Sequence, residues 1–331
     1  MSKKGLIFML AVFFTVGGLV QVSYGATYPT RAIEIYVGWS VGSYSDLNAR
    51  LIADRASKIL GQSVVVVNKP GAAGTLAATE VITAKPDGYR ICYHDTQWFA
   101  MVTKTQKLPY DPNTLVPLAN FTQYKGTISF RGDLPWKTVD DLLDYTRKQP
   151  DGHKLRWIHQ SPGTPPYCAM VSMFKKAGID FKEATVPMAI PGSPETLAQL
   201  LGGHVDCAVT GWSTIKDHVK TGRVKALVAL SAKRYTTPSD LPSALEMGHP
   251  ELVAFPIYFG VYVHKDTPPE IVKILSDTIK KICEDPEVPK IIDEKIGENP
   301  YFQGPEFIKA EIKKSEEIAV PLLKELGLYK Q

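Results

Sequence analysis

The sequence lacks the residue patterns that metal, redox and nucleotide chemistry require. Its four cysteines form no C-x-x-C pair, and its seven histidines are scattered without a metal-ligand spacing. It contains no G-x-x-x-x-G-K-[ST], G-x-G-x-x-G or H-E-x-x-H motif. We therefore expect neither a cofactor nor a metal site.

The cysteines are Cys92, Cys168, Cys207 and Cys283. Cys92 and Cys207 fall inside apolar segments that are typical of core strands, which favours buried free thiols. Export to an oxidising compartment would also permit disulfides, in more than one connectivity. The sequence leaves the redox state of these thiols open.

Neither sign of charge clearly predominates in the chain. The 331 residues contain 38 Lys and Arg against 34 Asp and Glu, a net charge of +4, and Lys3 and Lys4 lie in the N-terminal segment. No block of basic residues interrupts the rest of the chain. This balance does not favour nucleic acid or an anionic lipid surface, so we expect no nucleic-acid partner.

Beyond the N-terminus there is no apolar run long enough to span a bilayer. Lys3 and Lys4 precede an apolar run from Leu6 to Val20, and Ser23 and Gly25 fit a cleavage site after Gly25. This is the pattern of a secretory signal peptide. The alternative, an uncleaved anchor, is disfavoured because the run is shorter than the ~20 residues of a spanning helix. We expect residues 1–25 to be a cleaved signal peptide and the mature protein to be periplasmic.

Strands and helices alternate in the first part of the mature chain. Strands are expected at Ile33–Val37, Val64–Val67 and Arg90–Tyr93, with amphipathic helices at Ser45–Leu60 and Thr75–Ala84 between them. The second strand is fully apolar, as expected of a parallel strand buried on both faces. This order predicts βαβ units with right-handed crossovers.

The alternation restarts after a β-like segment from Leu118 to Phe130 and continues to Leu230. After Leu252–Val263 the chain is expected to be helical to its end, with a break near Pro321. A chain of this length accommodates about two domains. We therefore predict an α/β protein with two lobes: residues 26–130 plus 252–331 in the first, and 131–251 in the second.

Glycine and hydroxyl residues concentrate in four strand-to-helix loops, at residues 37–46, 68–74, 160–164 and 189–193. Glycine lets a backbone approach a ligand closely, and a helix N-terminus supplies free N–H donors and partial positive charge. Any one loop is adequately explained as an ordinary helix cap. Four such loops at the carboxyl ends of facing sheets predict an anion-binding cleft between the lobes.

The first of these loops also supports an enzyme hypothesis. Gly38 to Gly42 fits G-x-S-x-G, which makes Ser40 a candidate serine-hydrolase nucleophile. The expected helix begins several residues after Ser40, whereas an elbow nucleophile lies directly at the strand–helix turn. No histidine has the context of a catalytic base. We keep the hydrolase as a less favoured alternative to a binding protein without catalysis.

Several segments, in this order, resemble the substrate-binding subunit of tripartite tricarboxylate transporters, the TctC or Bug family. Ala84–Tyr89 matches the family's A-x-P-D-G-Y, and Leu200–Asp206 matches L-x-G-G-x-V-D. No single motif is specific, but their order and spacing cover the mature chain. The other matching segments are Tyr28-Pro29, Val37–Asp46, Leu60–Gly74, Gly222–Leu227, Leu241–Gly248 and Thr267-Pro268.

The resemblance implies a periplasmic-binding-protein fold of type II, the Venus flytrap, in which each lobe is a mixed or parallel sheet flanked by helices. It implies a monomer that binds a small carboxylate and delivers it to the membrane subunits of a tripartite tricarboxylate-type transporter. A ligand-sensing role beside a two-component kinase is equally compatible with it. The ligand-binding positions that it implies are Trp39, Ser40, Gly42, Ser43, Tyr44, Ser45, Asp46, Gly71, Ala72, Ala73, Gly74, Thr96, Gln97, Ser161, Gly163, Thr164, Pro191, Gly192, Ser193, Thr210 and Tyr258.

Departures from the family pattern bear on the ligand. Thr210 stands where the family often has an aspartate that could hold an α-amino group, which disfavours amino acids. Trp39 and Tyr44 add rings that could stack on an aromatic ligand, or could simply pack in the core. We hypothesise an aromatic or apolar mono- or dicarboxylate.

Overall fold

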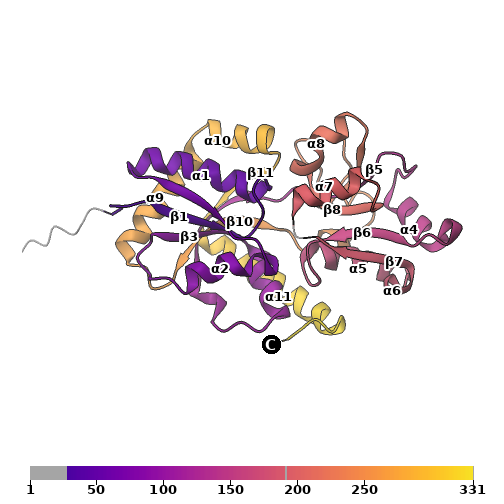
Figure 1. Cartoon of the computed structure of the whole chain (residues 1–331), viewed down its shortest axis with the longest axis horizontal. Coiled ribbons are helices and arrows are strands. Elements are labelled where there is room, and N and C mark those ends of the chain that lie inside the picture. The colour runs from indigo at the N-terminus through magenta and orange to yellow at the C-terminus, as the bar shows by residue number, and fades with distance from the viewer. Residues whose placement is uncertain (1–27, 191, 331) are drawn as a thin grey trace, which may run out of the picture.

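The protein is described by a computed structural model that covers residues 28–190 and 192–330, so the expected signal peptide lies outside the described residues. Two sheets, each flanked by helices, form two lobes that lie side by side (Figure 1). This confirms the predicted α/β architecture. Among the described helices, none combines the length and the apolar character needed to cross a membrane.

The first sheet contains β1 (Ile33–Val37), β2 (Val64–Asn68), β3 (Arg90–Asp95), β4 (Leu115–Gln123), β10 (Tyr258–His264) and β11 (Asn299–Gln303). Their spatial order is β11-β4-β10-β3-β1-β2. β1 pairs in parallel with β2 and β3, as the βαβ pattern predicts, while β10 is antiparallel to β3 and β4. The helices of this lobe are α1 (Tyr44–Leu60), α2 (Thr75–Ile82), α3 (Thr96–Ala100), α9 (Pro269–Glu284), α10 (Glu287–Lys290) and α11 (Pro305–Glu325).

The second sheet contains β5 (Gly126–Arg131), β6 (Leu155–His159), β7 (Thr185–Ala189), β8 (Cys207–Gly211) and β9 (Val224–Ala229), in the order β7-β6-β8-β5-β9. β6 is parallel to β7 and β8, and β5 is antiparallel to β8 and β9. The helices of this lobe are α4 (Val139–Lys148), α5 (Pro165–Lys176), α6 (Phe181–Ala184), α7 (Ser193–Leu201) and α8 (Trp212–Lys220).

The chain passes between the sheets at three places. β4 belongs to the first sheet and β5 to the second, so Tyr124 and Lys125 form the first crossing. The expected boundary at Phe130 falls inside β5, so the crossing lies earlier than predicted, because β5 pairs with β8 and β9. The chain returns to the first sheet between β9 and β10. Finally, α11 begins on the first lobe, but its Ala319 and Leu323 lie in the hydrophobic core of the second.

Helix ends follow from local side-chain chemistry. Ser43 caps α1 by accepting a hydrogen bond from the N–H of Asp46, and Gly61 ends the helix in the left-handed conformation. Thr138 and Asp141 form a capping box at the start of α4, a helix that was not predicted from the sequence.

The region after β10 differs from the expected all-helical tail. β11 adds an edge strand that includes Pro300, an allowed position because an edge strand can lack one N–H. The expected break at Pro321 is wrong, since α11 continues through it to Glu325. Pro321 and Glu317 are both exposed, so the carbonyl freed by the missing N–H faces water.

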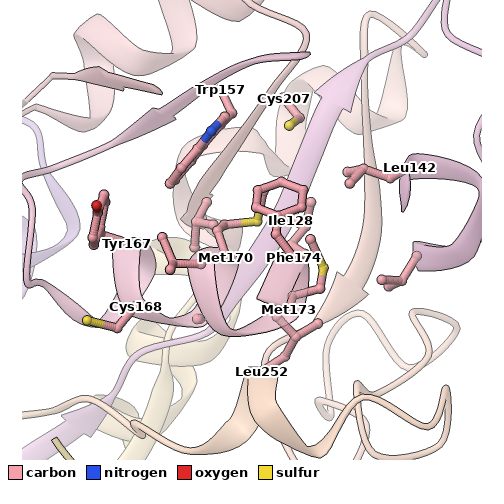
Figure 2. Packing of buried hydrophobic residues seen from close by; sticks show 14 of the residues in the cluster. Ile128, Leu142, Trp157, Tyr167, Cys168, Met170, Met173, Phe174, Cys207 and Leu252 are labelled. Atoms are coloured by element: carbon pink, nitrogen blue, oxygen red, sulfur yellow. The ribbon is translucent and has the colours of Figure 1, made fainter. Parts of the chain in front are cut away.

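Each lobe has its own hydrophobic core. In the second lobe, Met170, Met173 and Phe174 of α5 pack against Ile128 of β5 and Trp157 of β6 (Figure 2). All four cysteines are free, and three of them are buried, with the fourth half-buried. Burial raises the pKa of the thiols of Cys168 and Cys283 to about 12, so we expect them to react slowly in the folded protein.

Candidate functional site

A cavity lies between the two lobes, where loops from both converge. Its outer chamber has a volume of about 310 Å³ and is lined by the loop after β2, the 3₁₀ turn Val102–Thr105, the loop after β6 and the segment after α11. The lining residues are Ala72, Ala73, Val102, Thr105, Gln106, Ser161, Pro162, Thr164, Leu328 and Lys330. These loops come from separate sheets, so the chamber depends on the relative position of the lobes.

An inner chamber extends this space toward the first sheet. It shares Ala73, Val102 and Thr164 with the outer chamber, and its other lining residues are Trp39, Tyr44, Asp95, Gln160, Pro165, Ile257 and Phe259. Its volume of about 20 Å³ accommodates a single water molecule. With the lobes in this arrangement, a larger ligand fits only in the outer chamber. The two chambers together are called the interlobe cavity below.

The loop after β1 is fixed against the loop after β2 by backbone contact. A β-carbon on Gly38 would lie 2.5 Å from the Cα of Gly74, so only glycine allows this approach. The side-chain amide of Asn68 donates to the carbonyl of Trp39 at 3.0 Å and to Oδ1 of Asp46 at 2.9 Å. These contacts fix the backbone at Trp39, a residue that lines the inner chamber.

Asp46 supports this loop from below. Its Oδ2 accepts hydrogen bonds from the N–H of Gly42 at 2.9 Å and from Nε of Arg50 at 3.0 Å. Burial opposes ionisation, but the bonds from Arg50, Gly42 and Asn68 outweigh it and hold the pKa of Asp46 below its ordinary value. Asp46 therefore stabilises the loop as a carboxylate, and both of its oxygens already accept hydrogen bonds from the protein.

Four consecutive residues of the loop after β2 have positive φ. The angles are 134° at Gly71, 47° at Ala72, 52° at Ala73 and 92° at Gly74. The two alanines each cost about 1–2 kcal/mol in this conformation. Such strain concentrates at ligand clamps, where the surrounding structure enforces it. Here it presents Ala72 and Ala73 to the cavity.

Aromatic rings form the floor of the inner chamber. Trp39 lies edge-on to Phe259 at 5.5 Å and to His94 at 5.1 Å, and Tyr44 lies 5.1 Å from Phe259 and 4.7 Å from Tyr124. Burial raises the pKa of Tyr44 well above its ordinary value, and its hydroxyl is hydrogen-bonded to the side chain of Gln160 from the other lobe. Trp39 and Tyr44 thus pack against these rings and also line the chamber, and their stacking on an aromatic ligand stays a prediction.

The second lobe contributes the loop after β6. Thr164 occupies the N-cap position of α5, but its side chain makes no capping hydrogen bond, and its hydroxyl instead donates to the carbonyl of Ser161 at 2.6 Å. Pro165 and Pro166 occupy the first helical positions, so this helix offers fewer free N–H donors than its sequence context suggests. A β-carbon on Gly163 would lie 2.6 Å from Cγ2 of Thr105, which places this loop directly against the first lobe.

A separate contact joins the lobes beside the cavity. The hydroxyl of Ser40 donates to Oε1 of Glu195 at 3.5 Å, and the Glu195 carboxylate folds over Gly192 at the start of α7. Ser193 is the half-buried first residue of that helix. Pro191 lies outside the described residues.

Other predicted positions lie away from the cavity lining. Ser43 and Ser45 are buried and bonded to one another at 3.1 Å. The hydroxyl of Thr96 accepts from the N–H of Tyr258 at 3.3 Å, inside the first lobe. The Gln97 amide donates to the carbonyl of Pro256 and to Oγ of Ser315. The ring of Tyr258 packs on Tyr301 and Phe307, and the carbonyl of Thr210 accepts a hydrogen bond from the Thr127 hydroxyl within the second sheet.

Several lining residues were not predicted from the sequence. Asp95, the last residue of β3, lines the inner chamber and caps α3 by accepting from the N–H of Trp98 at 2.8 Å. Phe259 reaches the same chamber from β10, and Lys330 reaches the outer one from the far end of the chain. The position of Asp95 at a strand end was a usable signal, whereas nothing local marks Phe259 or Lys330.

The geometry around Ser40 does not resemble a nucleophile elbow. Six residues separate the end of β1 from the start of α1, and the Ser40 hydroxyl is hydrogen-bonded to a carboxylate. In a Ser-His-Asp hydrolase the nucleophile is instead hydrogen-bonded to an imidazole. Within the described ranges, His, Cys, Asp and Glu side chains form no cluster able to hold a metal ion.

Two α/β lobes around a cavity lined by both define a two-lobed solute-binding protein. The chain belongs to the tripartite tricarboxylate transporter receptor family, TctC, whose family model matches residues 48–328. This confirms the resemblance inferred from the motifs, and the family is one of solute-binding receptors.

Individual relatives agree with this assignment. The UPF0065 protein in the gbd 5′ region of Cupriavidus necator is 30% identical over 310 residues, which are 92% of this chain and 90% of that protein. The periplasmic binding protein BugD is 27% identical with a TM-score of 0.79, covering 92% of this chain and 100% of BugD. An R. palustris protein in its structure with adipate is 26% identical with a TM-score of 0.81, covering 91% of this chain and 98% of that protein.

Proposed function

We propose that the protein is a periplasmic receptor that binds a small carboxylate in the interlobe cavity. The observation that carries the proposal is that Ala72 and Ala73 of one lobe line the same chamber as Ser161, Pro162 and Thr164 of the other. A ligand there contacts both lobes and stabilises their closed arrangement by its differential affinity for it.

The strained loop after β2 is the first element of the ligand-binding site. Residues with positive φ can turn successive backbone N–H groups toward one side, which makes a concave site for an anion. The hydroxyls of Ser161 and Thr164 add polar groups from the second lobe, and the amide of Gln106, which also donates to Oγ1 of Thr75 at 2.8 Å, adds one from the first. Ala72, Ala73 and Val102 accommodate the apolar body of the ligand. This favours a carboxylate with an aliphatic or other apolar body.

Membership of the family supports delivery to a membrane transporter of the tripartite tricarboxylate type. In this proposal the receptor acts as a monomer, and the closed pair of lobes is the surface that the membrane subunits recognise. The adipate of the R. palustris relative supports a carboxylate as the ligand class.

The test is thermal unfolding of the mature protein against a panel of aliphatic and aromatic carboxylates. A ligand at 100 times its Kd adds about 2.7 kcal/mol to the stability of the folded state. The unfolding midpoint of the protein therefore rises with ligand concentration. Ala72→Asp should abolish the shift through charge repulsion. Residue 72 is exposed and lines the outer chamber, and aspartate tolerates the positive φ of this position.

The matched control is Ala72→Asn, which has nearly the same shape and no charge. It should retain most of the shift. Absence of a shift with every acid, together with labelling of Ser40 by a serine-hydrolase probe, would refute the receptor and favour the hydrolase.

A further inference from the structure

The segment after α11 forms one wall of the outer chamber and is attached to both lobes. Leu328 and Tyr329 pack against the hydrophobic core of the second lobe. The N–H of Lys330 donates to the carbonyl of Lys104, in the first lobe, at 2.8 Å. This segment therefore holds Lys330 at the junction of the lobes.

Lys330 is the single charged residue among those that line the outer chamber. Other lysines nearby are paired: Lys104 with Glu316 at 2.7 Å, and Lys175 with Glu325. Among the described residues, no carboxylate lies within ion-pair distance of the ammonium of Lys330, and this residue is exposed. Within the part of the chain that the structure describes, the chamber thus combines an uncharged polar and apolar lining with one lysine that has no carboxylate partner.

We propose that Lys330 binds an anionic group of the ligand in the outer chamber and makes the receptor prefer dicarboxylates over monocarboxylates. This inference rests on the proposed function. One carboxylate is held by the loops at residues 71–74 and 161–164, and the ammonium of Lys330 pairs with the second. Because the ammonium is exposed, its contribution is moderate and falls with ionic strength.

The test is isothermal titration calorimetry at low salt with three matched pairs of acids: succinate and butyrate, adipate and hexanoate, terephthalate and benzoate. Lys330→Gln should weaken binding of the preferred dicarboxylate about two- to fivefold, as expected for the loss of one exposed ion pair, and leave binding of its monocarboxylate partner unchanged. Lys330→Arg should retain the preference. Lys313→Gln, which removes an exposed lysine of α11 outside the cavity, is the charge-matched control and should behave as wild type.

Two results would refute the role of Lys330 without refuting the receptor function. In the first, monocarboxylates bind wild type as tightly as their dicarboxylate partners. In the second, Lys330→Gln weakens binding of both acids of a pair equally or weakens binding of neither. Failure of all six acids to bind wild type would refute the proposal about Lys330 and count against the proposed function as well.

Discussion

Replacing Glu298 with glutamine should stabilise the protein at pH 8 and change its stability little at pH 5. Glu298 is fully buried beside the first crossing between the lobes. Its Oε2 accepts from the N–H of Lys125 at 2.9 Å, and its Oε1 accepts from the hydroxyl of Ser213, in the second lobe, at 3.0 Å. Burial raises the pKa of this carboxyl from 4.5 to about 7.

The charged and titratable groups around Glu298 explain why the shift is not larger. The ammonium groups of Lys125 and Lys216 favour the carboxylate, although Lys125 is also paired with Asp293. The remaining neighbours that sense the charge of Glu298 are phenols, which are neutral over this pH range: Tyr44, Tyr93, Tyr124 and Tyr235.

The sign of the effect follows from linkage. The folded-state pKa is higher than the unfolded one, so this stabilisation is complete below about pH 4.5 and is lost as pH rises through 7. The difference between 7 and 4.5 is 2.5 pKa units, which corresponds to a cost of about 3 kcal/mol at pH 8. Glutamine avoids this cost, because its amide oxygen accepts from Lys125 and its NH₂ donates to Ser213. We expect a gain of about 1–3 kcal/mol at pH 8.

Urea unfolding of wild type and Glu298→Gln at pH 5 and pH 8 measures this difference. Glu317→Gln, which neutralises an exposed carboxylate on α11, is the control and should show no pH-dependent gain. A gain of equal size at both pH values, or a loss at pH 8, would refute the reasoning.

Two further predictions concern the strained loop and the thiols. Gly74→Ala should lower the free energy of unfolding by about 2–4 kcal/mol, because its β-carbon would lie 2.6 Å from Nε2 of His94 at a φ of 92°. Gly61→Ala, with positive φ but open surroundings, should cost only about 1 kcal/mol, and equal costs in urea titrations would contradict the close packing. Without reductant, all four thiols should react with a disulfide reagent in urea and react slowly in the native protein. A count below four in urea would indicate a disulfide.

Much of the fold was predictable because its elements are specified locally. The apolar run at Val64–Val67 and the helical spacing from Ser45 to Leu60 each predict an element that the structure contains as β2 and α1. The order of family motifs then specified the two-lobed architecture. The edge strand β11 was missed because its five residues include Pro300 and lack an alternating pattern.

The cavity was less predictable than the fold. The Gly-rich loops at residues 71–74 and 161–164 carry a local signal, and the structure brings them together. Phe259 is the second residue of the largely apolar strand β10, and only its register against β3 determines that it reaches the cavity. Lys330 lines the cavity because α11 continues through Pro321 and crosses to the second lobe, which depends on tertiary packing.

Capture of the ligand between the lobes is tested most directly by a crystal structure of the mature protein with the acid that raises its unfolding midpoint most. We expect the acid to lie in the interlobe cavity, in contact with residues 71–74 of the first lobe and 161–164 of the second. A different pocket of about 390 Å³ lies entirely on the first lobe, where Asn120, Lys280 and Phe302 are among its lining residues. An acid bound there, with an empty interlobe cavity, would contradict the central claim that the two lobes capture the ligand between them.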